Sequence, residues 1–293
     1  MTDYSIPKIQ ANCQDFILSL INNKKLNIIN NNNLICGIYE NLPVDNVKGG
    51  LLLFLKSLRK YNTNCKIIIW CDKNKFIPEY SIIEEQFDCL FVLYNIFNTN
   101  HHIQTRRLYL TRILLNIYKP NLILLSDMND VYFQNDPFKI DLQNSNIYCA
   151  LETNHFSNRT QSIRSNEKWL NRLSIDKKCY KSEYVICSGT IYGNYQGVIE
   201  FLDWVYKNNF LIHPNVLGLD QGYWIQYIYS VIKKNKCILT KIEESNILTC
   251  DRMKFPDTKD NKFINKLGNE YIIVHQINRI PKMVDYIKKY LCI

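Results

Sequence analysis

The fold is decided by the stretch NLILLSDMNDVYFQNDPF, which runs from Asn121 to Phe138. Its first part, Leu122 to Ser126, is a continuous apolar run that ends in a small polar residue, which is typical of a strand buried on both faces of a sheet. Two carboxylates, Asp127 and Asp130, follow this run. Because open α/β sheets bind ligands outside the carboxyl ends of their strands, these acids are well placed to hold a hard cation against a phosphate.

Segments typical of strands and segments typical of helices alternate along the rest of the chain. This alternation predicts an α/β fold with a mostly parallel central sheet and helices on both faces. The polar segment 152–181 has no clear assignment. We expect the other strands at 34–39, 65–70, 89–94, 147–151, 184–193 and 271–275, and the helices from about 50 and at 104–118, 196–207, 220–234 and 282–291.

The chain divides into a short N-terminal extension and one large domain. Residues 1–33 contain a predicted helix near 13–21 and the polar, low-complexity connector Asn30 to Asn33. Residues 34–293 form the predicted domain, which is long enough to bury roughly 75% of its unfolded surface without a disulfide or a structural metal. The eleven cysteines are scattered and include no C-x-x-C pair, so we expect free thiols in a reducing compartment.

The N-terminal sequence MTDYSIPKIQ lacks a basic region followed by an apolar core, so we expect no signal peptide. No run reaches the ~20 apolar residues that span a bilayer. These features predict a cytoplasmic protein without a membrane anchor. The abundance of Asn, Ile, Lys and Tyr points to an AT-rich genome, such as that of a large DNA virus or certain protists, and a viral protein would then act in the host cytoplasm.

The formal net charge of +9 raises the hypothesis of a nucleic-acid-binding protein. The lysines, however, are dispersed as pairs rather than gathered in a stripe or tail, so we expect no nucleic-acid partner. A mild positive field would also recruit a nucleotide diphosphate. A Rossmann-type oxidoreductase is disfavoured because no G-x-G-x-x-G follows the first predicted strand.

The stretch around Asp127 and Asp130 resembles the metal-binding Asp-x-Asp segment of glycosyltransferases with the GT-A fold. It is most similar to a subgroup with the pattern DxxDVxFQxDPF, which is similar to family 8-like retaining enzymes. Over roughly 34–291, three further pieces occur in the order of that family: Ile186 to Thr190, Asp220 to Gly222, and Val274 to Arg279. The resemblance implies a single GT-A (Rossmann-like) domain and a metal-dependent transfer of a sugar from a nucleotide-sugar donor, with a UDP-sugar favoured, to a glycan, protein or lipid acceptor.

The resemblance also implies a metal site made by Asp127, Asp130 and His275. Two carboxylates suit Mn²⁺ or Mg²⁺, and one imidazole favours Mn²⁺. This chain departs from the family because two residues, rather than one, separate its acids. Asp130 aligns with the second acid of the family, whereas Asp127 either contacts the metal through water, with Asn129 in part of its usual role, or binds the ribose.

Further residues are assigned to the donor and to catalysis by the same resemblance. Asp220 is expected to stabilise the sugar cation in a retaining reaction or to act as the base in an inverting one, and its alternative role is a helix N-cap. Tyr39 stacks on a pyrimidine or simply packs at the sheet edge, and Trp169 stacks on a sugar or is structural. Gln221 is expected to act in catalysis together with Asp220, both pointing at the donor sugar and its anomeric carbon. The remaining residues expected at the donor are Arg107, Ser188, Gly189, Arg279 and Lys282.

A second class of function stays open on this sequence. A GT-A domain that has lost catalysis and only binds a sugar nucleotide or a carbohydrate would keep most of these residues. The unusual spacing of Asp127 and Asp130 is where such a loss would begin. Turnover of a donor separates the two functions.

Overall fold

The computed structural model describes residues 33–40, 50–94, 102–157, 160–174, 180–208, 216–251, 254–280 and 282–291. The expected N-terminal extension lies outside these residues except for Asn33, and so does the helix predicted near 13–21. The division into an extension and a domain therefore stays a prediction. Within the described part of the chain, no helix is long and apolar enough to cross a membrane.

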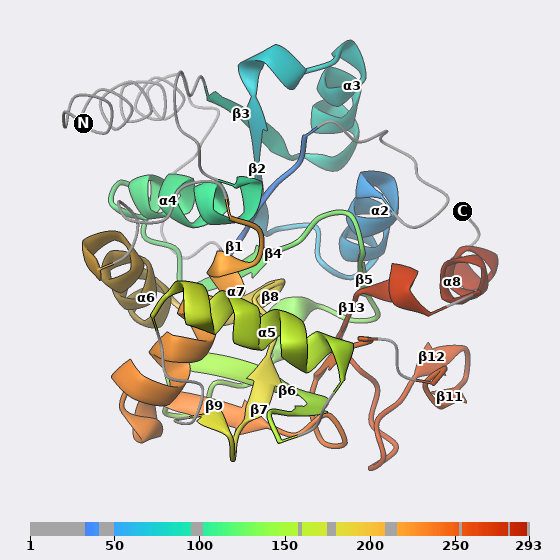
Figure 1. The fold of residues 1–293 in the computed structure, drawn as a ribbon. Helices are drawn as coiled ribbons and strands as arrows, with labels where there is room; N and C mark the ends of the chain where they lie inside the picture. The colour runs from blue at the N-terminus through green and yellow to red at the C-terminus, as the bar shows by residue number, and fades with distance from the viewer. Residues whose placement is uncertain are drawn as a thin grey trace.

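The centre of the molecule is one mixed, mostly parallel sheet (Figure 1). Its first half is parallel, in the order β3-β2-β1-β4. Beyond β4 the pairing is antiparallel through β8, β6 and β7, and β9 adds to β6 in parallel. The strands are β1 Leu34–Ile38, β2 Lys66–Asp72, β3 Leu90–Tyr94, β4 Leu122–Ser126, β6 Ile147–His155, β7 Tyr184–Ile186, β8 Thr190–Asn194 and β9 Cys237–Thr240.

Helices cover both faces of this sheet and explain the apolar run of β4. Leu124 faces a core formed with α2 and α3, whereas Ile123 and Leu125 face a core formed with α4, α6 and α7. Side chains alternate between the faces of a strand, so a strand packed on both sides must be apolar throughout. The helices are α2 Leu51–Tyr61, α3 Pro78–Phe87, α4 Ile103–Leu115, α5 Gln161–Arg172, α6 Tyr195–Asn208, α7 Leu219–Gln226 and α8 Met283–Leu291.

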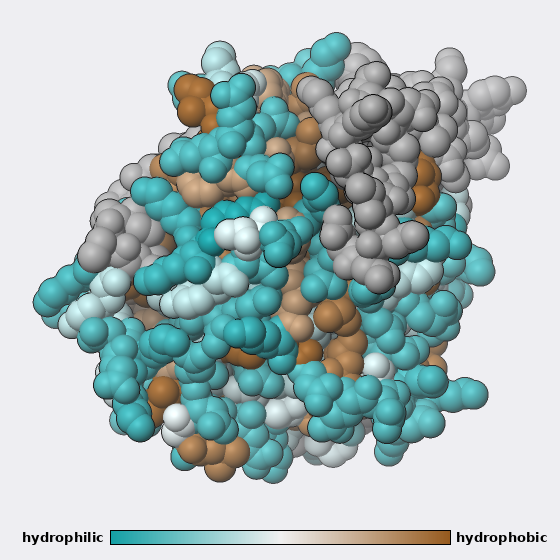
Figure 2. Space-filling model, turned by 180° about the vertical axis from the view of Figure 1, so that it is seen from behind, coloured by the Kyte–Doolittle hydropathy of each residue, from teal (hydrophilic) through white to brown (hydrophobic). Residues whose placement is uncertain are grey.

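Burial of the apolar side chains between sheet and helices leaves a polar exterior. The face opposite to that of Figure 1 is largely hydrophilic where it is coloured, and its hydrophobic side chains form small, separate patches (Figure 2). The fold class expected from the sequence is confirmed. The differences are local: α3, α5 and several short strands were not expected, and the single strand predicted at 184–193 is two strands separated by residues 187–189.

A second, small sheet brings the end of the chain against the acidic stretch. Its order is β10-β13-β5, with β10 Ile247–Thr249, β13 Ile273–His275 and β5 Val131–Phe133. β13 runs antiparallel to β5, and His275 lies opposite Val131. The hairpin of β11 Thr258–Lys259 and β12 Lys262–Phe263 lies beyond it. This pairing places a late histidine beside the acids that precede β5.

Gln134 explains why a polar residue follows β5. Its side chain is fully buried, and its Nε2 donates to the carbonyl oxygens of Phe263 and Tyr271 at 3.0 and 2.7 Å. Its Oε1 accepts the backbone N–H of Phe263 at 2.7 Å. One amide thus satisfies three backbone groups of two other segments, which ties β12 and the approach to β13 onto the acidic stretch.

We expect Gln134→Leu to destabilise the protein by about 2–5 kcal/mol, because three buried backbone groups lose their partners at roughly 1–3 kcal/mol each, with partial relief from water. Urea unfolding measures this loss. The matched control is Gln196→Leu, whose exposed amide bonds only Glu200 and whose loss is expected within about 0.5 kcal/mol. Equal stability of the two variants would contradict the role given to Gln134.

Candidate metal centre and adjoining pocket

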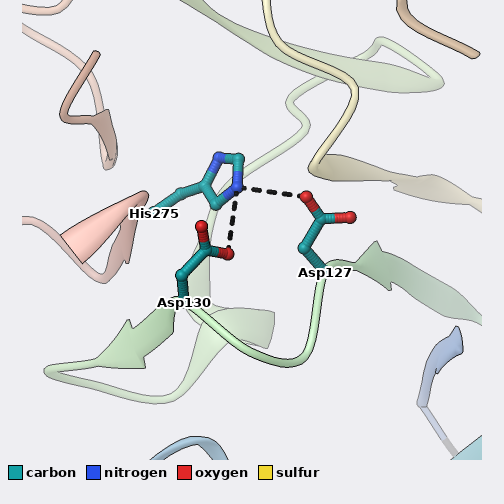
Figure 3. Close-up of side chains that lie close together, drawn as sticks. All are labelled: Asp127, Asp130 and His275. Atoms are coloured by element: carbon teal, nitrogen blue, oxygen red, sulfur yellow. Dashed lines mark ion pairs between the residues drawn. The ribbon is translucent and has the colours of Figure 1, made fainter. Parts of the chain in front are cut away.

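Three side chains that the sequence places far apart converge at the carboxyl end of β4. Asp127 follows β4, Asp130 precedes β5, and His275 ends β13. Figure 3 shows both carboxylates pointing toward the same imidazole nitrogen, with Nε2 of His275 3.3 Å from Asp127 Oδ2 and 3.6 Å from Asp130 Oδ1. One possible ligand atom from each residue lies within 4.8 Å of the others, so the group can hold a metal ion.

The two residues between the acids are accommodated because one of them points into the core. Met128 is 2% exposed and packs beneath β1, where it leaves no room for a side chain at position 37. A Cβ on Gly37 would lie 2.6 Å from Met128 Cε and 2.5 Å from the Ser126 carbonyl oxygen. With Met128 turned inward, Asp127 and Asp130 both face His275. The departure from Asp-x-Asp spacing therefore keeps both carboxylates in the cluster.

The donor set fits a divalent cation. His275 is 1% exposed, and its Nε2 makes no hydrogen bond although it is buried. A buried polar atom without a hydrogen bond costs free energy unless something else occupies its lone pair. Carboxylate oxygens with one imidazole nitrogen are ligands that first-row divalent ions accept. His275, Asp127 and Asp130 therefore have the chemistry and the arrangement of a metal site.

The charges around this nitrogen reinforce that assignment. Burial disfavours the ionised form of Asp127, but Arg107 and His275 outweigh it and hold the pKa of Asp127 below its ordinary value. Burial raises the pKa of Asp130, although His275 opposes it. Burial would lower the pKa of His275, but Cys187 and the two carboxylates raise it well above its ordinary value. The imidazole thus sits in a strongly negative environment, which also favours a cation.

Arg107 connects this site to two neighbouring segments. It projects from α4, is 1% exposed, and its Nη1 lies 2.5 Å from Asp127 Oδ1. Its Nη2 donates to the carbonyl oxygen of Ser188 at 3.1 Å and to Asp220 Oδ2 at 3.4 Å. One guanidinium therefore fixes the end of β4, the turn between β7 and β8, and the start of α7.

Asp220 is held by side chains and is not the N-cap of its helix. Gly218 takes the cap position of α7, with φ of 80°, and Asp220 lies in the first turn. Its Oδ2 accepts from Ser188 Oγ at 2.7 Å, while its Oδ1 makes no hydrogen bond. Burial raises the pKa of Asp220, and Arg107 opposes this shift. The next residue, Gln221, donates to Asn166 Oδ1 at 2.6 Å.

Gly189 allows the turn between β7 and β8 to pass against the metal site. A Cβ at this position would lie 2.1 Å from His275 Cε1 and 2.8 Å from Asp127 Oδ2. Its carbonyl oxygen accepts the backbone N–H of Asp127 at 2.8 Å. Of the two residues expected at the donor, Gly189 therefore lies directly against Asp127 and His275, whereas Ser188 contacts Asp220 and Arg107.

A polar pocket of about 420 Å³ opens beside these residues. Trp169 and Gln221 lie on its lining, and so do Gln276, next to His275, and Arg279. Hydroxyl, amide and carboxylate groups predominate, with one aromatic ring, which is the composition that a polyhydroxylated ligand requires. The lining residues are Glu152, Thr153, Thr160, Gln161, Ser162, Ser165, Asn166, Trp169, Gln221, Asp251, Gln276 and Arg279.

Two residues expected at the donor lie elsewhere. The ring of Tyr39 is 1% exposed and packs edge-on against Tyr80 in the core, so the packing alternative describes it in this structure. Lys282 is exposed and lines a separate hollow with Phe255 and Tyr286. Donor binding by Lys282 remains a prediction that this geometry does not favour.

The sequence did not reveal a second polar cluster at the carboxyl ends of β1 to β3. Glu40 is buried and accepts from Lys75 Nζ and from the backbone N–H of Asp72, both at 3.2 Å, as well as from the hydroxyl of Tyr94. The side chain of Arg106 is 16% exposed, and its Nη2 lies 3.7 Å from Glu40 Oε2. The only sequence signal was the position of Glu40 directly after a strand.

Comparison with known proteins adds little. No protein-family model matches the chain, and no curated protein matches it. Among solved structures, the chain is similar to the glycosyltransferase GlyE of Streptococcus pneumoniae TIGR4, with a TM-score of 0.41 and 13% sequence identity. The match covers 73% of this chain and 46% of that one, so this chain spans less than half of the matched chain. A likeness this distant carries no argument about function.

We expect Gly189→Ala to weaken Mn²⁺ binding by roughly 10–100-fold or more, because the new methyl group displaces the imidazole of His275. Electron paramagnetic resonance of free Mn²⁺ measures the Kd. Gly268→Ala is the control, since it strains a residue with φ of 79° but has open space around its Cβ. Wild-type affinity in Gly189→Ala would exclude His275 as a ligand.

We expect Arg107→Met to destabilise the protein by about 3–5 kcal/mol, because Asp220 is then buried without a cation. Arg112→Met on the same helix removes a partly exposed pair with Asp203 and should cost less, about 1 kcal/mol. Urea unfolding compares the two. When Asp220→Asn is combined with Arg107→Met, we expect part of the lost stability to return, because no uncompensated charge is left buried at position 220. Destabilisations that simply add in the double variant would refute the pairing of Arg107 with Asp220.

Proposed function

We propose that this protein is a metal-dependent glycosyltransferase that moves a sugar from a nucleotide-sugar donor, with a UDP-sugar favoured, to a glycan, protein or lipid acceptor. The observation that carries the proposal is the group Asp127, Asp130 and His275 at the carboxyl end of β4, beside a polar pocket. In the parallel half of the sheet the strand order reverses between β1 and β4, and this group lies at that point. Open α/β sheets bind nucleotides at such a reversal.

Glycosyl transfer requires stabilisation of the leaving diphosphate. Asp127, Asp130 and His275 would hold Mn²⁺ or Mg²⁺, which supplies Lewis-acid stabilisation of the developing negative charge, and the imidazole favours Mn²⁺. Arg279 lines the pocket on the side of His275 and adds a fixed positive charge for the phosphates. The proposal thus gives Asp127, Asp130, His275 and Arg279 a role in the departure of the nucleotide.

The sugar would lie in the polar pocket. Gln221 and Asn166 are joined at 2.6 Å and present a fixed amide pair to its hydroxyl groups. The indole of Trp169 offers an apolar face on which a pyranose ring can stack. An ordered, polar lining with one aromatic ring supports a sugar as the ligand rather than an apolar molecule.

Asp220 would stabilise the positive charge that develops on the sugar ring. Ser188 and Arg107 hold its Oδ2, which leaves Oδ1 without a hydrogen bond. A carboxylate fixed in this way needs no reorganisation as the oxocarbenium character develops. Because Asp220 is anchored by an arginine, we favour its role as an electrostatic stabiliser in a retaining reaction over that of a general base in an inverting one.

The second candidate function is a domain that binds a sugar nucleotide or carbohydrate without turnover. The retention of both acids beside His275, despite their altered spacing, favours the enzyme. The two functions differ in one measurable respect: the enzyme releases free nucleotide from its donor in the presence of metal, and the binding module does not.

We expect one of UDP, GDP, CMP and TDP to stabilise the protein against heat only when Mn²⁺ is present. A nucleotide at 100 times its Kd should add about 2.7 kcal/mol of stability. Asp130→Asn should abolish this shift because it removes a metal ligand. Asp141→Asn is the control, since Asp141 is exposed and its Oδ1 accepts a backbone N–H that an asparagine oxygen can also accept.

Release of nucleotide from the matching sugar donors is then measured with and without Mn²⁺. Metal-dependent release supports the glycosyltransferase. A thermal shift without release would select the binding module instead. No shift with any nucleotide would refute the glycosyltransferase and the sugar-nucleotide-binding module, and would leave carbohydrate binding as the remaining alternative.

A further inference from the structure

We propose that Cys187 is a positioning residue of the metal centre: its sulfur accepts a hydrogen bond from Nδ1–H of His275 and so presents the Nε2 lone pair of that histidine to the ion. The inference rests on the proposed function, because it concerns the same metal site. It adds a residue that contacts neither the metal nor the sugar.

The two side chains are in contact inside the protein. Cys187 directly follows β7, and its Sγ lies 3.6 Å from His275 Nδ1. Both residues are buried, with 6% and 1% of their surfaces exposed. The side-chain amide of Gln276 also donates to this sulfur, at 3.9 Å. The sulfur is therefore held against the ring from the side opposite the carboxylates.

The contact decides which imidazole nitrogen carries the proton. A neutral imidazole has one N–H and one lone pair, and a metal ligand needs its lone pair on the nitrogen that faces the ion. In this site Nε2 faces Asp127 and Asp130. The proton must then lie on Nδ1, where it needs an acceptor because the ring is buried. Cys187 is the residue that stands at that position.

A thiol is an unusual partner for this task. Metal-bound histidines almost always donate their second N–H to a carboxylate, a backbone carbonyl or water. The sulfur of Cys187 lies beside Nδ1 of His275 and the side-chain amide of Gln276, away from the carboxylates that face Nε2. A thiol sulfur is a weak acceptor, so it can orient the ring without replacing the carboxylates as metal ligands.

All three residues of the segment Cys187-Ser188-Gly189 then contact the side chains of the site. Cys187 contacts Nδ1 of His275, and Gly189 leaves room for the adjoining ring atoms Cε1 and Nε2. The residue between them, Ser188, donates to Asp220. Three consecutive residues thus contact both the histidine of the metal centre and the buried carboxylate of Asp220.

The test measures Mn²⁺ affinity by electron paramagnetic resonance in the protein of residues 1–293. Cys187→Ala should weaken Mn²⁺ binding about tenfold, the low end for removal of a partner behind a metal ligand, because sulfur is a weak acceptor. Cys187→Ser keeps a polar acceptor and should bind more tightly than the alanine variant. Cys89→Ala is the control, since Cys89 is an equally buried thiol near α3, away from the site.

A spectroscopic readout separates positioning from stability. In the Co²⁺-loaded protein, the ligand-field bands should shift in Cys187→Ala and return toward wild type in Cys187→Ser, because the imidazole changes its orientation. Unfolding in urea reports any general loss of stability. If the alanine variant does not fold, the Kd and the Co²⁺ spectrum of the serine variant show whether Cys187 positions His275.

The outcomes distinguish this inference from the proposed function. Wild-type protein that binds Mn²⁺, together with a Cys187→Ala variant of unchanged Kd and Co²⁺ spectrum, would overturn the role of Cys187 and leave the metal site intact. Wild-type protein that binds no Mn²⁺ would refute the metal centre itself, and the positioning role with it. A weakened alanine variant with partial recovery in the serine variant supports the inference.

Discussion

The site depends on the hydrogen bonds and ion pairs that the buried guanidinium of Arg107 makes. It lies between Asp127 and Asp220 and also donates to the carbonyl oxygen of Ser188. Taking Arg107 and Asp220 out of water costs more free energy than their one ion pair returns, and the further contacts of the guanidinium with Asp127 and Ser188 offset that cost. The arginine thus serves as an internal counter-charge that lets the carboxylates of Asp127 and Asp220 lie close to each other.

The acidic stretch combines architecture with chemistry in one short segment. Leu124 faces one core and Leu125 the other, Met128 turns into the sheet, and Gln134 satisfies three backbone groups. The side chain of Asp136 accepts from Asn62 and from the backbone of Phe138. Most of these residues hold the segment in place, which explains why so long a pattern surrounds only two acids that face the metal site.

The fold and part of the site were predictable because they rest on local periodicity and on strand ends. The apolar run of β4 matched its observed bounds, since a strand with a core on each face is apolar up to its end. β10 and α5 escaped prediction, because β10 has three residues and shows no period, and α5 is largely polar. The N-cap alternative for Asp220 was wrong because Gly218, with positive φ, occupies the cap and the helix already begins at Leu219, one residue before Asp220.

By itself, the sequence determined the chemistry that the site can perform: two acids after a buried strand, a histidine at the end of a late one, and an α/β sheet to carry them. Only the tertiary structure decided which residues of the site contact one another. Cys187 and His275 are 88 residues apart, and Arg107 and Asp220 are 113 apart. Periodicity encodes which face of an element is buried, whereas the partner across the core depends on how all the elements pack together.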